Sequence, residues 1–579
     1  METPEVFSVN RNVKEKIKRS NVMKNSTIGK YLGRGILAIL TLALVATVAM
    51  GQNLVIGGTP TFTGAGIINV KGAINNSVVA SISGVVNLTG TAAQTIGTTG
   101  ALTFSTLNVN TTVGAASLAV STAVNTALLI SASSTLNIQD NTLSIGGTST
   151  RNVTGVLTAG GTSTVNFTSG AAQDVMPNSY ANLGLSGAGI KTFPVGTTTV
   201  NTSLTASSDI TTTGTLAFAA AATGTISGAL VNNGTFTAPT TGLITFNGAV
   251  AQGISGTNPL TFTALTLSGA GVKNADVNIS VGGQLTVDQT LNMLTAGNRL
   301  LTMLNSAAAT QPIYGSLMEV TGRMQWQAFA AQSYTFNNAL TVLTFSAADP
   351  ARTFELNVQP ATAPSSYIAV NTVNREIHAS YAAWLAGTAN MQLAYQHSEA
   401  DASLNQTRLK EFHGAVTSAN KLVGTISRLG SIAGSLGWVK HTLLPIGGGF
   451  TSGEEIQLDN HFSTFISIAS TAWNLSTTWD AADVPISTDD VEIAPTFAVN
   501  IPTGYAATAL SVLIDAGATG GLTLDGNATL TVGAGGITNN NIAPGAGLNV
   551  AAGTGVVTIN LGNLTNNGLI TNAGTITVQ

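Results

Sequence analysis

Apolar and polar residues alternate in short runs along most of the chain, and turn residues separate these runs. Examples are Leu243-Ile244-Thr245-Phe246 and Gln284-Leu285-Thr286-Val287. Strict alternation sends one set of side chains to a core and the other outward, which is typical of β-strands. Pairs such as Asn233-Gly234 accept the positive φ of tight corners. The pattern predicts an all-β fold of many short strands.

One block of this pattern recurs at a fixed interval. Its copies span residues 88–96, 167–175 and 246–254, and a Leu-x-Leu-Ser-Gly-Ala-Gly-x-Lys run follows the last two. The equivalent glutamines, Gln94, Gln173 and Gln252, lie 79 residues apart. Fixed-period similarity indicates stacked repeats, and a coil takes roughly 20–25 residues, so one period holds three or four coils. We therefore predict a parallel β-solenoid (β-helix) over residues 52–308, with a 79-residue super-repeat.

A transmembrane β-barrel is the alternative for residues 52–308. Such a barrel needs strands of about 10 residues and girdles of aromatic side chains. This segment has no Trp and only one Tyr, Tyr180. The composition therefore favours the solenoid.

Residues 309–462 have a different composition, with larger and more charged side chains. Trp326, Trp384 and Trp438 all lie here. Large mixed side chains suit a globular core, and we predict an antiparallel β-sandwich between two solenoids. The stretch 404–426 has apolar spacing that also fits a helix.

Residues 463–579 return to short runs of small residues, which predicts a second β-solenoid. Trp473 and Trp479 are expected to cap its first coil. The sequence stops at Gln579 inside an apparent repeat, where an end coil would expose apolar surface. We expect that this second solenoid is truncated and that a missing C-terminal part anchors the protein to the envelope. The alternative is that the open end of the solenoid meets a partner.

The pattern Phe-x-Gly-x-x-x-Gln-x-Ile, followed by Leu-Thr-Leu-Ser-Gly-Ala-Gly-Val-Lys and Val-Gly-Gly-Gln-Leu-Thr-Val, carries a resemblance. It resembles repeats in secreted, adhesin-like β-helical surface proteins of the Bacteroidetes–Chlorobi type, over residues of about 80–290. The order of motifs at 320–323, 334–339 and 393–395 is similar to a module found beside such repeats. The resemblance implies a β-helical protein of the cell envelope.

The N-terminal residues have the composition of a signal peptide. Residues 1–34 hold eight of the 21 basic residues, and an apolar run follows at 35–50. Ala49-Met50-Gly51 is a small-residue cleavage signal, so we predict a signal peptide over residues 1–51, with a retained anchor as the alternative. Met23 would start a more ordinary leader. The expected location is secreted or at the cell surface, in association with an outer membrane.

The charge balance limits the kinds of partner that the protein can bind, and the cysteine content limits what can stabilise its fold. From Gln52 onward 13 basic residues face 22 acidic ones, which argues against nucleic acid as a partner. Cysteine is absent, so packing and backbone hydrogen bonds alone hold the fold. Extracellular surfaces or polysaccharide are the expected partners.

Candidate chemistry is sparse. The densest acidic cluster, a weak Ca²⁺ candidate and the sole suggestion of a cofactor, is Asp480, Asp483, Asp489, Asp490 and Glu492. Its alternatives are a solvated turn and an acid–base pair. The five histidines form no zinc motif, and the close histidine–carboxylate group of His397 with Glu399 and Asp401 is expected at the surface.

The remaining candidate residues are three aromatic side chains and the polar side chains at the corners of the repeat. Trp384, Tyr381 and Tyr395 are weak candidates for stacking on sugar rings, with core packing as the alternative. The repeated glutamines are expected to hydrogen-bond a corner of their own coil. Lys191 and Lys273 follow Gly-Ala-Gly turns and are expected to be solvated.

The expected function is structural or adhesive and non-catalytic, with a recognition module on a β-solenoid stalk. One alternative is a β-helical polysaccharide lyase or glycosidase, but residues 52–308 contain no Glu. The other is the passenger of a self-exporting outer-membrane protein.

Overall fold

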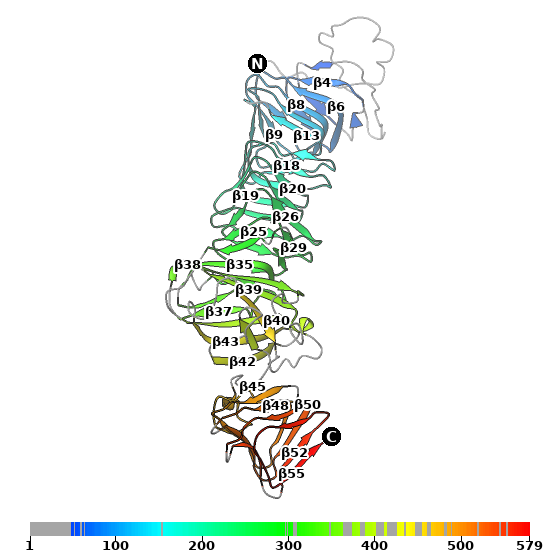
Figure 1. Ribbon diagram of the computed structural model, residues 1–579. Helices are drawn as coiled ribbons and strands as arrows, with labels where there is room; N and C mark the ends of the chain where they lie inside the picture. Colours follow the sequence, from blue (N-terminus) through cyan, green and yellow to red (C-terminus); the bar gives the residue numbers. More distant parts are fainter. Residues whose placement is uncertain are drawn as a thin grey trace. The chain divides into compact units, whose positions relative to one another are not determined.

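In a computed structural model, the chain is almost entirely β-structure over the described residues (Figure 1). It divides into two compact units, Met1–Val342 with Ala348–Gln359, and Leu343–Ala347 with Pro360–Gln579. The structure describes residues 48–579 except 51–52, 58–60, 63, 152–153, 296, 298, 305–309, 330, 347–348, 363–372, 382–387, 401–409, 414–424, 433–435, 446–453, 460–464, 480–482, 488, 518–519, 544–545 and 552–553.

Parallel strand pairing in successive coils builds a β-solenoid, as the alternation and the repeat predict. The described residues form about 20 of its turns. In the first unit, one parallel sheet contains β4 (Ile67–Val70), β6 (Ala80–Leu88), β8 (Leu102–Val109) and β10 (Thr122–Ile130). A second parallel sheet contains β5 (Ile74–Asn76), β7 (Gln94–Ile96) and β9 (Ala115–Leu118). Each coil thus contributes a strand to more than one face.

The 79-residue super-repeat consists of four coils. Phe167 pairs in register with Leu185, Leu185 with Ala206, Ala206 with Ile226, and Ile226 with Phe246. These residues end strands β15 (Thr164–Phe167), β17 (Ser179–Leu185), β19 (Thr197–Ala206), β22 (Thr223–Ile226) and β25 (Ile244–Phe246). All five side chains are buried, so the repeat unit is a set of coils sharing one core column.

Inside the solenoid, aromatic rings pack edge to face both within a coil and between neighbouring coils. The Phe236 and Phe262 ring centroids lie 5.6 Å apart, and those of Phe246 and Phe262 lie 6.1 Å apart. Outside, small polar residues stack in register. One column is Thr205, Thr225, Thr245, Thr266 and Thr286. Hydroxyl groups, rather than charges, therefore cover this face.

The repeated glutamines hold corners of the solenoid. Gln252 is 2 % exposed; its Oε1 accepts the Gly248 N–H at 3.0 Å, and its Nε2 donates to the carbonyls of Ile226 (2.9 Å) and Gly228 (2.6 Å). Gln94 and Gln173 make the same set of bonds. The predicted bond within the coil is present. The amide also ties each corner to the preceding coil.

Lys191 and Lys273 are fully buried, so the prediction that they are solvated is wrong. Lys273 pairs in register with Gln252, and its Nζ donates to the carbonyls of Gly248 (3.0 Å) and Gly271 (2.7 Å). Lys191 does the same at Ser169 and Gly189. Each lysine binds the carbonyl of the residue whose N–H binds the glutamine. The ammonium group thus adds a hydrogen bond to turn carbonyls, including that of Gly248, which also accepts the Gly271 N–H.

Burial lowers the pKa of Lys273 from 10.5 to about 8 and also lowers the pKa of Lys191. Between these values the unfolded chain holds a proton that the folded chain has released, so stability rises with pH from about 8 to about 10.5. We expect a gain of up to about 3 kcal/mol over this interval. Thermal unfolding of the protein and its Lys273→Met variant checks this, because the variant should lose the part of the slope that Lys273 contributes and keep the part due to Lys191. Equal slopes would contradict it.

Parallel pairing continues beyond the boundary predicted at residue 308. β33 (Leu300–Met303) pairs in parallel with β35 (Val320–Phe329), and β35 pairs antiparallel with β38 (Asp349–Pro360). β35 is therefore the strand at which the pairing changes direction. Trp326 is buried there, its ring 5.0 Å from that of Tyr334.

Antiparallel strands are present in the second unit, within residues 309–462 as predicted. β39 (Arg375–Tyr381) and β41 (Lys410–His413) pair with β44 (Glu454–Asp459), and β40 (Thr388–Gln396) and β42 (Thr425–Ile432) pair with β43 (Leu436–Pro445). β41 and β42 occupy two parts of the stretch that also suited a helix. The face-to-face sandwich stays a prediction.

The second solenoid region stacks β46 (Asp490–Ile493), β48 (Ala506–Ile514), β50 (Thr529–Asn539) and β52 (Val556–Ile559) in parallel. Trp473 and Trp479 are buried at its start, with ring centroids 4.9 Å apart, and the Trp479 Nε1–H donates to the Trp473 carbonyl. The tryptophan pair thus lies where the sequence predicts it.

Within the predicted leader, the described residues form β1 (Val48–Met50), which pairs in parallel with β4. The rest of the basic and apolar segment lies outside the described residues. No helix in the described part of the chain has the length and apolar character to span a membrane.

Candidate functional site

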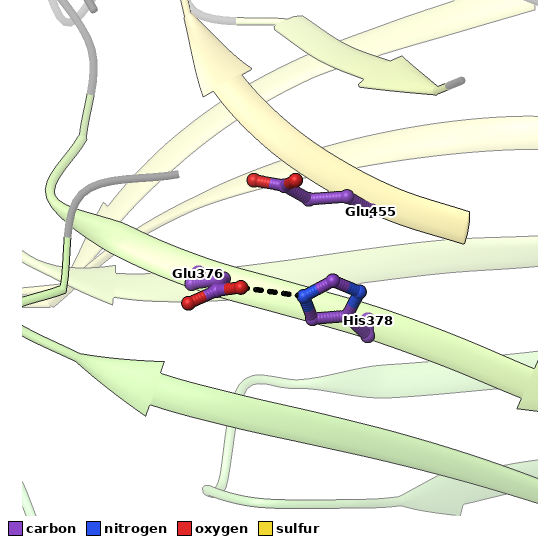
Figure 2. A group of neighbouring side chains, drawn as sticks. All are labelled: Glu376, His378 and Glu455. Carbon is purple, nitrogen blue, oxygen red and sulfur yellow. Dashed lines mark hydrogen bonds and ion pairs between the residues drawn. The ribbon is translucent and has the colours of Figure 1, made fainter. Parts of the chain in front are cut away.

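Three polar side chains converge on one face of the antiparallel region (Figure 2). Glu376 and His378 lie two residues apart on β39, and Glu455 on β44 is directly opposite His378 in the register. One ligand atom from each lies within 4.8 Å of the others. The His378 Nε2 and the Glu376 Oε1 are 2.6 Å apart. The sheet register therefore brings one imidazole and two carboxylates together.

Burial differs among the three side chains. Glu455 is 4 % exposed, whereas the side chains of Glu376 and His378 are 13 % and 28 % exposed. Alternation along β39 directs Arg375, Ile377 and Ala379 to the opposite, buried face. The group is thus closed on the Glu455 side and open to solvent at His378.

The neighbouring Arg375 forms a buried ion pair with Glu399 on the opposite face of the strand. Its guanidinium is completely buried and forms two bonds to Glu399, from Nε to Oε2 at 2.8 Å and from an Nη to Oε1 at 3.1 Å. The Glu399 carboxylate also accepts the backbone N–H groups of Ala361 and Gln396. In the group predicted at the surface around His397, Glu399 is instead buried against Arg375, and Asp401 lies outside the described residues.

Nitrogen and carboxylate oxygen donors at this spacing suit a divalent metal ion or a proton-transfer pair. Sequence reasoning missed the group, because Glu455 is far from His378 in the chain. The Glu-x-His spacing on a strand was the available signal, since it places both side chains on one face.

The predicted Ca²⁺ cluster is not assembled among the described residues. The one described group of three His, Asp or Glu side chains with adjacent ligand atoms is the one around His378. Asp489 is buried and accepts the Ile486 N–H, Asp490 bonds Ser511, and Glu492 alternates outward on β46. Asp483 bonds the following backbone N–H, and Asp480 lies outside the described residues. Asp483, Asp489 and Asp490 thus each have a local hydrogen bond.

Of the three aromatic residues predicted to stack on sugars, one is a core residue, and the side chains of the other two are not described by the structure. Tyr395 is 1 % exposed and packs over Gly437 on the neighbouring strand, where a Cβ would meet the phenol ring. Burial raises the pKa of Tyr395 to about 12. It is a core residue with no free face for a sugar. Trp384 lies outside the described residues, and for Tyr381 the backbone alone is described, at the end of β39.

In comparisons with family models, curated proteins and solved structures, nothing matched this chain. The β-helical fold therefore rests on the strand pairing described above.

Proposed function

We propose that this protein is a non-catalytic structural or adhesive component of the cell envelope, secreted to the cell surface. In this proposal the β-solenoid is a scaffold, and the antiparallel region carries recognition of extracellular surfaces or polysaccharide. The finer assignment, to adhesin-like surface proteins of the Bacteroidetes–Chlorobi type, rests on the repeated sequence blocks and on the solenoid they form.

The use of buried polar groups carries this proposal. In the solenoid the buried glutamines and lysines bond backbone carbonyls and N–H groups of their own and adjacent coils. These side chains maintain the coil, and their hydrogen-bonding atoms are engaged by the backbone. Parallel strand pairing joins each coil to the next, which gives a repetitive and mechanically continuous structure, as in other solenoids.

The surface of the solenoid also suits adhesion. The in-register threonine column presents hydroxyl groups on successive coils, at the strand spacing of about 4.8 Å. Hydroxyls donate and accept hydrogen bonds, as sugars do. A surface with few charges favours neutral or weakly charged polymers over nucleic acid.

Co-sedimentation with insoluble polysaccharides tests the proposal. We expect the purified full chain to sediment with at least one neutral polysaccharide, and to do so equally at low and high salt, because charge contributes little. A heat-unfolded sample is the control for non-specific capture. Failure to bind any member of a broad polysaccharide panel and any cell surface would contradict an adhesive role.

A further inference from the structure

We propose that Glu376, His378 and Glu455 form a binding site for a divalent transition-metal ion, with Zn²⁺ as the fitting ion. The site joins two strands, β39 and β44, from distant parts of the sequence. This inference does not depend on the proposed adhesive function.

The distances require little rearrangement. Zinc bonds nitrogen and carboxylate oxygen at about 2.0–2.2 Å, so two ligands of a tetrahedral ion lie about 3.3 Å apart. The ligand atoms here lie within 4.8 Å of one another on directly opposed and alternate strand positions. Small rotations of the two glutamate side chains close the difference. The ion would replace the His378–Glu376 hydrogen bond, and His378 would then carry its proton on Nδ1.

Charge gives the second argument. Two carboxylates lie side by side here, and that of Glu455 is buried, so they repel each other more than they would in water. The adjacent Arg375 points to the opposite face and is held by Glu399. A divalent ion bound between the two glutamates offsets this repulsion.

The donor set decides the kind of ion. Calcium takes six to eight oxygen ligands and magnesium keeps an octahedron of oxygens, whereas an imidazole with two carboxylates suits zinc and related ions. Three protein ligands leave a fourth position for water. Because His378 is the most exposed of the three side chains, that position faces solvent. The arrangement is thus an open site that also cross-links the sheet.

Calorimetric titration of the chelator-treated, untagged full chain with ZnCl₂ tests the site. We expect saturable binding of one equivalent, and a rise in melting temperature with Zn²⁺. Glu455→Gln and His378→Gln should each weaken binding by at least about tenfold. His397→Gln is the matched control, because His397 lies in the same region and packs on Tyr395 outside the group; its affinity should not change.

A second variant and a further measurement keep the test decisive. If Glu455→Gln fails to fold, the partly exposed His378→Gln variant supplies the affinity comparison. X-ray absorption of the zinc-loaded protein should show one imidazole among light-atom ligands. Absence of saturable Zn²⁺ binding, or equal affinity in the protein and its His378→Gln variant, would overturn the proposal.

Discussion

Arg375→Met is expected to destabilise the second unit by about 3–5 kcal/mol, because it leaves the buried Glu399 carboxylate without its cation. Glu399 is 6 % exposed and Arg375 is completely buried, so water cannot replace the guanidinium. The two backbone N–H groups that Glu399 also accepts provide partial compensation at best. Urea unfolding followed by tryptophan fluorescence measures the loss.

Arg299→Met is the control for this prediction. Arg299 also faces a carboxylate, that of Asp276, at 3.5 Å, but the two side chains are 41 % and 42 % exposed. Exposed pairs contribute about 0–1 kcal/mol, so the control should change stability little. The double variant Arg375→Met with Glu399→Leu should recover much of the lost stability. Equal effects of Arg375→Met and Arg299→Met would show that burial does not govern the pair.

Gln252→Leu should cost about 3 kcal/mol, the second largest effect. The substitution keeps the bulk of the side chain but removes the partner of the Gly248 N–H and of the Gly228 carbonyl. The Ile226 carbonyl also loses a bond but keeps the one from the Asn247 N–H. Each buried group that loses its hydrogen bond costs about 1–3 kcal/mol, and relaxation of the corner recovers part of the sum. Thermal unfolding measures the change, and hydrogen exchange should place the loss of protection around residues 226–254.

Gln289→Leu is the control at the surface of the same solenoid. Its Nε2 also donates to two turn carbonyls, those of Gly269 and Ala270, but these bonds are exposed and water can replace them. We expect a loss below about 1 kcal/mol. A loss as large as that of Gln252→Leu would mean that the buried corner has no special role.

The regular parts of this fold could be predicted from the sequence, because every coil of a solenoid repeats the same pattern of inward and outward residues. Alternation set the strands, and the spacing of Gln94, Gln173 and Gln252 predicted several coils per period. The registry from Phe167 to Phe246 shows that the number is four. Periodic pattern and periodic structure correspond because each coil repeats the same inward and outward positions.

Features that depend on three-dimensional partners were not readable. A lysine after a glycine turn normally reaches water, but Lys191 and Lys273 turn inward to carbonyls of the corner. The end of the parallel pairing at β35 depends on which strand lies on its far edge. The group around His378 needed the register of two strands separated by most of the antiparallel region. Composition carries no trace of these pairings.

The measurement that tests the central claim most directly is the chain length of a bound polysaccharide over time. The full chain is incubated with each polysaccharide that it sediments with, with and without added Zn²⁺, and the recovered polymer is sized and assayed for new reducing ends. A structural or adhesive protein leaves the size distribution unchanged while remaining bound. A progressive fall in chain length, with new ends in proportion to protein, would contradict the account and establish an enzyme.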